Sequence, residues 1–278
     1  MQPLAGIRIL TLAGRLPGPV AVARLHRYGA GAVKIEPAAG DPLFHACPDW
    51  YHELHRGIAV VRLNLKEASE RARLDEFLAD SDLLITAQRP ASLERLGLAW
   101  SQLHARCPRL SHIAVVSHQP PDDTLPGHDL TYQARLGLLD PPHLPRALIA
   151  DWAGAHEIVS TALALMLARE RGQGPASVTV SLADAAADFA EPLRHGLTAC
   201  AGLLGGGFAG YALYRARDGW IALAALEPQF WRRLGQEIAS AEPSGPELQA
   251  FFAQRTKGEW EAWGRERDLP LAAVAGPF

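Results

Sequence analysis

The run GIRILTL at residues 6–12, together with the segments directly after it, constrains the fold more than any other stretch. Its β-branched and apolar residues are typical of a buried strand. The segment GRLPGP then turns the chain, residues 20–30 have helical spacing, and AVKIEP at residues 32–37 has the pattern of a second strand. A strand, a helix and a second strand in this order form a β-α-β unit, which predicts a parallel sheet with crossover helices.

The same alternation continues along most of the chain. A polar-faced helix is predicted over 66–81, and a long buried helix starts at Asp151 and stops near Gly172. Further strands are predicted over 82–87, 110–116 and 177–182. This part of the chain therefore predicts an α/β fold with a Rossmann-like parallel sheet and helices on both of its faces.

The pattern of the sequence changes after about residue 200. A glycine-rich stretch leads to a hairpin whose turn is predicted at Asp218–Gly219, and amphipathic helices come after it. This pattern indicates a smaller α+β domain. We therefore divide the chain into a large α/β domain at 1–195, a linker at 196–204 and a small domain at 205–278.

Charge and composition exclude several classes of protein. The net charge of −3 gives no basic surface for nucleic acid or for an anionic membrane. The longest apolar run, at 158–168, is too short to span a bilayer, and no charged-then-apolar leader opens the chain. The three cysteines, Cys47, Cys107 and Cys200, lie far apart and form no C-x-x-C motif, which predicts a cytoplasmic protein without disulfides.

Two segments that could be mistaken for cofactor or metal sites have simpler interpretations. GRLPGP after the first strand lacks the G-x-G-x-x-G fingerprint, so we expect no nicotinamide nucleotide there. HACPDWYHELH at residues 45–55 gathers three histidines and a cysteine, but its spacing is H-E-x-H and not H-E-x-x-H, which would place two ligands on one helix face. We predict a solvated loop and no metal site.

Three polar residues remain as candidates, each with an ordinary interpretation. Asp151 stands at the start of a long helix, where it is either the N-cap or an ionised carboxylate facing the crevice of a switch point. His128, in the turn PGHD, is either a partly exposed turn residue or, with Asp151, one of two bases. Glu227 precedes Pro228 and is accounted for as the start of a helix.

The order of motifs along the chain resembles the family III CoA-transferases, the CaiB/BaiF group, which also contains the α-methylacyl-CoA racemases. PLAGIRILTLAGRLPGPVAVARLHRYGAGAVKIEPAAGDP opens the resemblance, and LHRG, LNLK, SDLLI, RPASLERLGL, CPRL, IADWAG and RGQGPASVTVSLADAA continue it in order. GHDLTYQARLGLL and LLGGGFAGYALYRARDGWIALAALEPQFW are similar to the racemase branch. The resemblance covers essentially the whole chain.

This resemblance implies an acyl-CoA enzyme that binds no cofactor tightly and takes coenzyme A as part of its substrate. It also implies that the large domain at 1–195 binds CoA. In racemase chemistry His128 and Asp151 would be the two bases at the α-carbon of a 2-methylacyl-CoA, and Glu227 would orient His128. The enolate oxygen would need donors, for which the amides at the start of the 151 helix are candidates.

Two other functions are compatible with the same residues. In the transferase branch Asp151 would be the nucleophile, forming an acyl anhydride and then a thioester with CoA, which would be transferred to a carboxylic acid. A non-catalytic relative would instead bind an acyl-CoA or another subunit on the same fold. Retention of His128, Asp151 and Glu227 argues for catalysis.

Several positions depart from the family's pattern. Arg56 is kept in HRG, but Ile58 and Ala59 stand where a basic pair for the CoA phosphates is usual. Arg89 matches the arginine of the family's F-R-P-G run, and we expect Arg56 and Arg89 to bind CoA. The family also implies a homodimer of interlocked chains, whose return segment would lie beyond LPLAAVAGPF, where this sequence stops.

Overall fold

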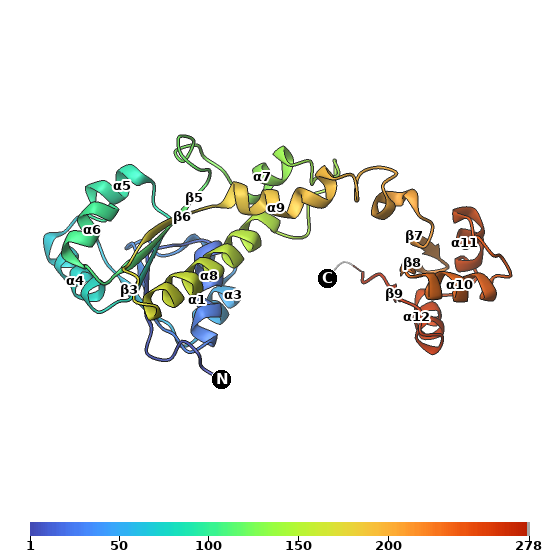
Figure 1. Ribbon diagram of the computed structural model, residues 1–278, viewed down its shortest axis with the longest axis horizontal. Coiled ribbons are helices and arrows are strands. Elements are labelled where there is room, and N and C mark those ends of the chain that lie inside the picture. The colour runs from blue at the N-terminus through green and yellow to red at the C-terminus, as the bar shows by residue number, and fades with distance from the viewer. Residues whose placement is uncertain (277–278) are drawn as a thin grey trace. The chain divides into compact units, whose positions relative to one another are not determined.

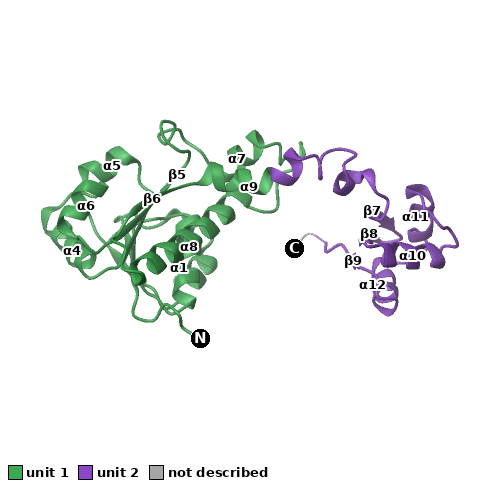
Figure 2. Cartoon of the chain, viewed as in Figure 1, with its two compact units in different colours: residues 1–190 green, residues 191–278 purple. Residues whose placement is uncertain are grey.

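The computed structural model describes residues 1–276. The chain divides into two compact units, residues 1–190 and residues 191–278 (Figure 2). Each unit packs around hydrophobic cores of its own.

The first unit contains a six-stranded parallel sheet in the order β3-β2-β1-β4-β5-β6. Its strands are β1 (Arg8–Thr11), β2 (Gly31–Glu36), β3 (Ala59–Arg62), β4 (Leu83–Thr86), β5 (Ser111–Val116) and β6 (Ser177–Ser181). The chain builds the sheet outward from β1 to β3 and then returns to the centre at β4. This reversal is a switch point, at whose carboxyl edge ligands bind in open α/β sheets.

Helices cover both faces of this sheet, as Figure 1 shows. One face carries α1 (Pro17–Arg27) and α8 (Ile149–Glu170), and the other carries α4 (Ala68–Ala79), α5 (Pro90–Arg95) and α6 (Trp100–Arg106). The remaining helices are α2 (Pro42–Ala46), α3 (Pro48–Leu54), α7 (Asp129–Arg135) and α9 (Leu182–Arg194), which continues into the second unit. Apart from Arg8 at the start of β1, both central strands are buried, because apolar helices pack on each side of them.

The predicted α/β fold is confirmed, but the structure differs from two local expectations for the first unit. No strand is predicted from the sequence at AVVR, where β3 pairs with β2. Three of its four residues are exposed at the sheet edge, so no buried pattern marks them. The predicted solvated loop at 45–55 instead forms parts of α2 and α3, and Tyr51 and His55 are buried there.

The second unit is the predicted smaller α+β fold. Its antiparallel sheet, in the order β7-β8-β9, contains β7 (Tyr211–Ala216), β8 (Gly219–Ala224) and β9 (Leu271–Ala273). A short π-type turn (Leu203–Gly207) precedes it, and its helices are α10 (Pro228–Glu237), α11 (Gly245–Phe252) and α12 (Lys257–Glu266). Trp260 and Phe252 lie at the centre of its core. No helix in the described part of the chain is both long and apolar enough to cross a membrane.

The hairpin turn lies one residue before its predicted position. Ala216 pairs with Gly219, so the turn residues are Arg217 and Asp218. The Asp218 carboxylate accepts a hydrogen bond from the Lys257 amide at 2.7 Å. A contact with a distant segment therefore holds this turn. The dipeptide Asp-Gly alone could not indicate the exact position of the turn.

Candidate active site

Two loops at the carboxyl edge of the sheet form one wall of the candidate site. The loop after β1, residues 12–16, and the loop after β4, residues 87–89, flank the switch point. The Gln88 side-chain amide donates a hydrogen bond to the Leu12 carbonyl oxygen at 2.8 Å and ties the loops together. Both loops line the same cavities, along with residues that come after β5.

One cavity of about 310 Å³ contains both candidate bases. His128, which immediately precedes α7, is exposed, whereas Asp151, in the first turn of α8, is partly buried. The other residues that line the cavity are Gly14, Arg15, Pro17, Gly18, Ala87, Val115, Val116, Ser117, Gly127, Tyr132 and Leu182. The fold therefore brings together two residues whose convergence sequence spacing could not establish.

Asp151 is not the N-cap of its helix, which was its ordinary interpretation. α8 begins at Ile149, and a carboxylate from α7 serves its first turn. Oδ1 of Asp129 accepts hydrogen bonds from the amides of Ala150 (2.7 Å) and Asp151 (3.2 Å). Within residues 1–276 no hydrogen bond reaches the Asp151 carboxylate, which faces the cavity.

These contacts also overturn the expected enolate donors. The amides of Ala150 and Asp151 are already bonded to Asp129, and the Trp152 amide donates to the Leu148 carbonyl oxygen at 3.0 Å. An amide that donates within the protein is not available to a substrate oxygen. These three amides at the start of α8 therefore do not form an oxyanion hole.

The environment of Asp151 changes its acidity. Burial raises the pKa of Asp151 to about 6, and the negative charge of Asp129 acts in the same direction. The positive charge of Arg15 partly opposes this rise in the pKa. A carboxyl group with a pKa near 6 is suited to proton transfer near neutral pH, and perturbed carboxyls in clefts are typical of catalytic sites.

Tyr132 is a site residue that the sequence interpretation missed. Its side chain is 2% exposed, yet its hydroxyl has no hydrogen-bond partner within residues 1–276. Burial raises the pKa of Tyr132 and the charge of Asp151 adds to the rise, so the hydroxyl remains protonated. The Ser117 hydroxyl is close enough to oppose this rise, but its geometry is not that of a hydrogen bond.

Gly127 is matched to this tyrosine. A Cβ atom at Gly127 would lie 2.3 Å from the Tyr132 hydroxyl oxygen, so only glycine fits there without displacing the ring. A buried donor without a partner is costly, and an oxygen of a ligand in the cavity would satisfy it. Tyr132 lies one helical turn after His128, and this spacing is the signal that could have identified it.

A second cavity, of about 220 Å³, adjoins the first. Arg89 lines it, at the end of the loop that comes after β4. The two cavities share Arg15, Ser117 and His128 among their lining residues. Together they extend from Asp151 to Arg89, which suits an elongated ligand with a reactive group at one end and negative charge at the other.

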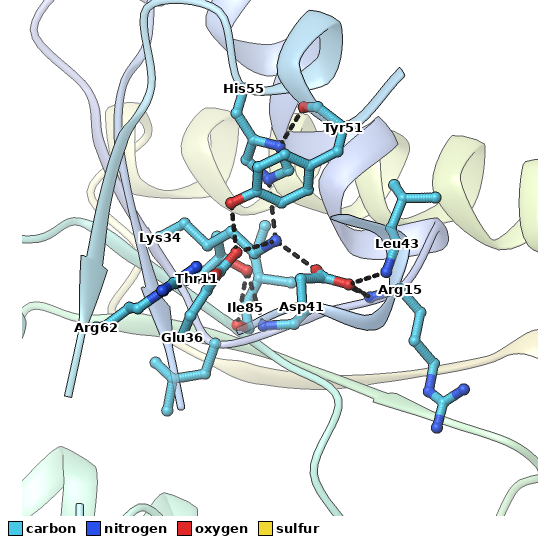
Figure 3. Close-up of polar contacts among 12 residues, drawn as sticks. Thr11, Arg15, Lys34, Glu36, Asp41, Leu43, Tyr51, His55, Arg62 and Ile85 are labelled. Carbon is cyan, nitrogen blue, oxygen red and sulfur yellow. Dashed lines mark hydrogen bonds and ion pairs between the residues drawn. The ribbon is translucent and has the colours of Figure 1, made fainter. Parts of the chain in front are cut away.

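A buried cluster of charged residues lies beside the loop after β1 (Figure 3). Lys34 is 1% exposed, and its ammonium group lies 2.5 Å from Asp41, 3.0 Å from Glu36 and 3.0 Å from His55. The Tyr51 hydroxyl donates to Glu36 at 2.8 Å. Burial lowers the pKa of His55, so its neutral ring donates from Nδ1 to the Tyr51 carbonyl oxygen and accepts from Lys34 at Nε2.

Asp41 connects this cluster to the candidate site. Its two carboxylate oxygens accept the Arg15 amide at 3.0 and 3.1 Å, and Oδ1 also accepts the Leu43 amide at 2.9 Å. Burial acts to raise the pKa of Asp41, but the hydrogen bonds from Lys34 and Leu43 outweigh it and lower the pKa. Arg15 has a φ of 66°, a left-handed conformation that is unfavourable for a residue other than glycine. The cluster therefore holds this loop in place.

Two further predicted residues lie outside these cavities. Arg56 is exposed in the turn between α3 and β3, at the amino edge of the sheet. Glu227 belongs to the second unit, where it is exposed and precedes α10, whose first residue is Pro228. The roles assigned to both stay predictions. Within residues 1–276 no three His, Cys, Asp or Glu side chains are grouped to hold a metal ion.

Comparison with known proteins relates the chain to acyl-CoA enzymes. The family model described as CoA-transferase family III matches residues 4–277. The probable fatty acyl-CoA transferase Rv3272 of Mycobacterium tuberculosis is 26% identical, over 98% of this chain and 77% of its own. Cinnamoyl-CoA:phenyllactate CoA-transferase of Clostridium sporogenes is 27% identical over 96% and 77%. Human α-methylacyl-CoA racemase is also 27% identical, over 92% and 74%.

Solved structures share the fold. A crystal structure of Rv3272 from Mycobacterium tuberculosis aligns with a TM-score of 0.87 at 24% identity, covering all of this chain and 85% of that chain. A CaiB/BaiF family protein from Brucella suis aligns with a TM-score of 0.80 at 19% identity, covering 99% and 84%. Transferases and a racemase match this sequence equally well, so the likeness does not favour either activity.

The buried cluster predicts a large effect of one substitution on stability. Lys34→Met would leave the carboxylates of Asp41 and Glu36 buried without their shared cation. We expect the free energy of unfolding to fall by about 3–5 kcal/mol, as measured by urea denaturation. The control is Lys66→Met, an exposed lysine outside the ion pairs of residues 1–276, for which we expect a change within about 0.5 kcal/mol. Equal effects of the two substitutions would contradict this account of the cluster.

Proposed function

The chain belongs to CoA-transferase family III, and we propose that within this family it is an acyl-CoA epimerase that inverts the α-carbon of a 2-methylacyl-CoA thioester. His128 and Asp151 are the two bases of this reaction. The observation that carries the proposal is that both side chains line one cavity. An inversion of this kind needs an acid and a base on opposite faces of the reacting carbon.

The reaction passes through an enolate, and one group removes the α-proton while the other delivers a different proton to the opposite face. Ionised Asp151 takes the α-proton, and the electrons of the C–H bond move onto the thioester oxygen. Protonated His128 then gives a proton to the opposite face of the α-carbon, and in the reverse direction the roles exchange. Each well-placed acid or base contributes about 10²–10⁴ in rate. The pKa of Asp151, raised by burial to about 6, supports its role as a base near neutral pH.

The Tyr132 hydroxyl is the donor proposed for the thioester oxygen. It is protonated, buried and without a partner within residues 1–276, and it lines the cavity that contains both bases. A donor fixed before the reaction stabilises the negative charge that develops on the oxygen without reorganisation. This role replaces the one expected for the amides at the start of α8.

Binding of the CoA portion is assigned to the arginines identified in the sequence. Arg89, in the adjoining cavity, lies where the nucleotide end of an extended CoA would meet positive charge. Arg56 is retained as a second candidate, although it is exposed at the amino edge of the sheet. Glu227 is retained as the residue that orients His128, and we propose a cytoplasmic homodimer. Family III enzymes use CoA thioesters as substrates and need no tightly bound cofactor.

CoA transfer through Asp151 is the second candidate function. The match to the cinnamoyl-CoA:phenyllactate transferase, equal to the match to the racemase, supports it. In that reaction the Asp151 carboxylate attacks the thioester carbonyl, CoA leaves as the thiolate, and an acyl-aspartyl anhydride remains. The two candidate functions use the same carboxylate, so the need for His128 and the formation of a covalent intermediate on Asp151 are what separate them.

Loss of either base should abolish inversion. We expect His128→Ala and Asp151→Asn each to slow interconversion of the two 2-methylacyl-CoA enantiomers by at least about 100-fold. The measurement is chiral analysis in deuterium oxide, with deuterium incorporation measured by mass spectrometry. His143→Ala and Asp140→Asn, which change residues outside both cavities, are the matched controls and should retain the wild-type rate.

If the His128→Ala variant still inverts the substrate at the wild-type rate, the assignment of His128 and Asp151 as the two bases is wrong. If the wild-type protein inverts no substrate, incubation with an acyl-CoA and hydroxylamine tests the transferase candidate, which expects a hydroxamate at Asp151. An unmodified Asp151 would contradict that candidate as well. Binding of CoA without either reaction would identify a non-catalytic relative.

The environment of Asp151 predicts the pH dependence. In the direction in which Asp151 takes the proton, only its carboxylate form is active, so kcat/KM should rise with pH through about 6. Asp129→Asn removes a negative charge that raises the pKa of Asp151, so the midpoint should move to lower pH. A midpoint unchanged by Asp129→Asn, in a variant with the wild-type circular dichroism spectrum, would show that another group controls this limb.

A further inference from the structure

Arg15 is a cation in the reaction cavity that no side chain within residues 1–276 neutralises. It lines the cavity that contains Asp151 and the adjoining cavity that contains Arg89. None of the ion pairs or side-chain hydrogen bonds within the described residues involves its guanidinium group. Figure 3 shows that this side chain points away from the buried cluster that holds its backbone.

The backbone of Arg15 is fixed by unusual means. Its left-handed conformation is unfavourable, and the Asp41 carboxylate holds it by accepting the Arg15 amide with both oxygens. Asp41 is in turn paired with buried Lys34. Strained residues held in this way cluster at ligand-binding sites, where the surrounding structure determines their position. The guanidinium group therefore starts from a fixed point at the edge of the cavity.

The position of Arg15 relative to Asp151 identifies the part of the substrate that it meets. The charge of Arg15 lowers the pKa of Asp151 against the effect of burial, so it lies near the reacting carboxylate. The two groups nevertheless form no ion pair within 4.0 Å. In CoA the long pantetheine arm separates the thioester from the phosphates. Arg15 lines the cavity that contains Asp151, where the acyl group would lie, and it also borders the adjoining cavity, whereas Arg89 lines the adjoining cavity alone.

We propose that Arg15 forms a carboxylate-binding subsite, and that the protein selects acyl-CoA thioesters whose acyl group carries a second, free carboxylate. A guanidinium group offers paired N–H donors that match the two oxygens of a carboxylate. This inference rests on the proposed action on an acyl-CoA through Asp151. It adds the chemical class of the acyl group, which the two bases do not specify.

Two thioesters that differ in one group test the subsite. 2-Methylsuccinyl-CoA carries a terminal carboxylate where 2-methylbutanoyl-CoA carries a methyl group. We expect the wild-type protein to bind the first about 10- to 100-fold more tightly by calorimetry, as expected for a charge-assisted pair. Arg15→Asn should reduce this ratio to near one, because asparagine tolerates the left-handed backbone but carries no charge. Arg15→Lys should restore part of the ratio.

Arg89→Gln is the matched control for the phosphate contacts of CoA. It should weaken binding of both thioesters and of free CoA alike and leave their ratio unchanged. If Arg15→Asn instead weakens free CoA as strongly as Arg89→Gln does, Arg15 binds a phosphate of CoA and the proposal is wrong. An unchanged ratio in Arg15→Asn also overturns it.

The ratio of affinities does not depend on turnover. A protein that inverts neither thioester but discriminates between them through Arg15 would contradict the proposed epimerase activity and retain the subsite. A protein that inverts both at equal rates and binds them equally would retain the activity and exclude the subsite.

Discussion

The carboxylate of Asp129 joins the two segments that carry the candidate bases. It belongs to α7, directly after His128, and it accepts the amides of Ala150 and Asp151 at the start of α8. Its other oxygen accepts a hydrogen bond from Gln133, whose side-chain amide also donates to the Ala147 carbonyl oxygen at 3.0 Å. A buried side chain with this many partners fixes how α7 and α8 meet. The same negative charge acts on Asp151, so one residue both positions the site and changes its acidity.

The sequence predicted the architecture well because the central strands and long helices have strong local patterns. The run LLIT in β4 is buried throughout, and α8 ends at Glu170, next to the arginine and glycine that marked its stop. Prediction from the sequence failed where tertiary contacts decide the structure. The exposed edge strand β3 has no buried pattern, and the 45–55 segment becomes helical with His55 packed against Lys34. Spacing along the chain cannot reveal such contacts.

The candidate site could be predicted from the sequence only in part, because contacts between distant segments also decide its structure. His128 and Asp151 were identified by their residue types and by family resemblance, and the fold places both on one cavity. Of the two interpretations of Asp151, the N-cap is wrong, because the acceptor for the first amides of α8 is Asp129, on another helix and 21 residues before Ala150 in the chain. Tyr132 was missed because its significance lies in the absence of a partner within residues 1–276, which depends on burial.

The attachment of the Arg15 loop to a buried ion cluster has a consequence for the energetics of ligand binding. Local opening of a loop is easy where its contacts are exposed, but Asp41 and Lys34 are each almost completely buried. Releasing Arg15 would therefore require opening a part of the protein as stable as its interior. The conformational entropy of this loop is lost when the protein folds and not when a ligand arrives. The binding surface at this edge of the cavity is thus preorganised. Its affinity for a ligand should weaken only under conditions that begin to unfold the first unit.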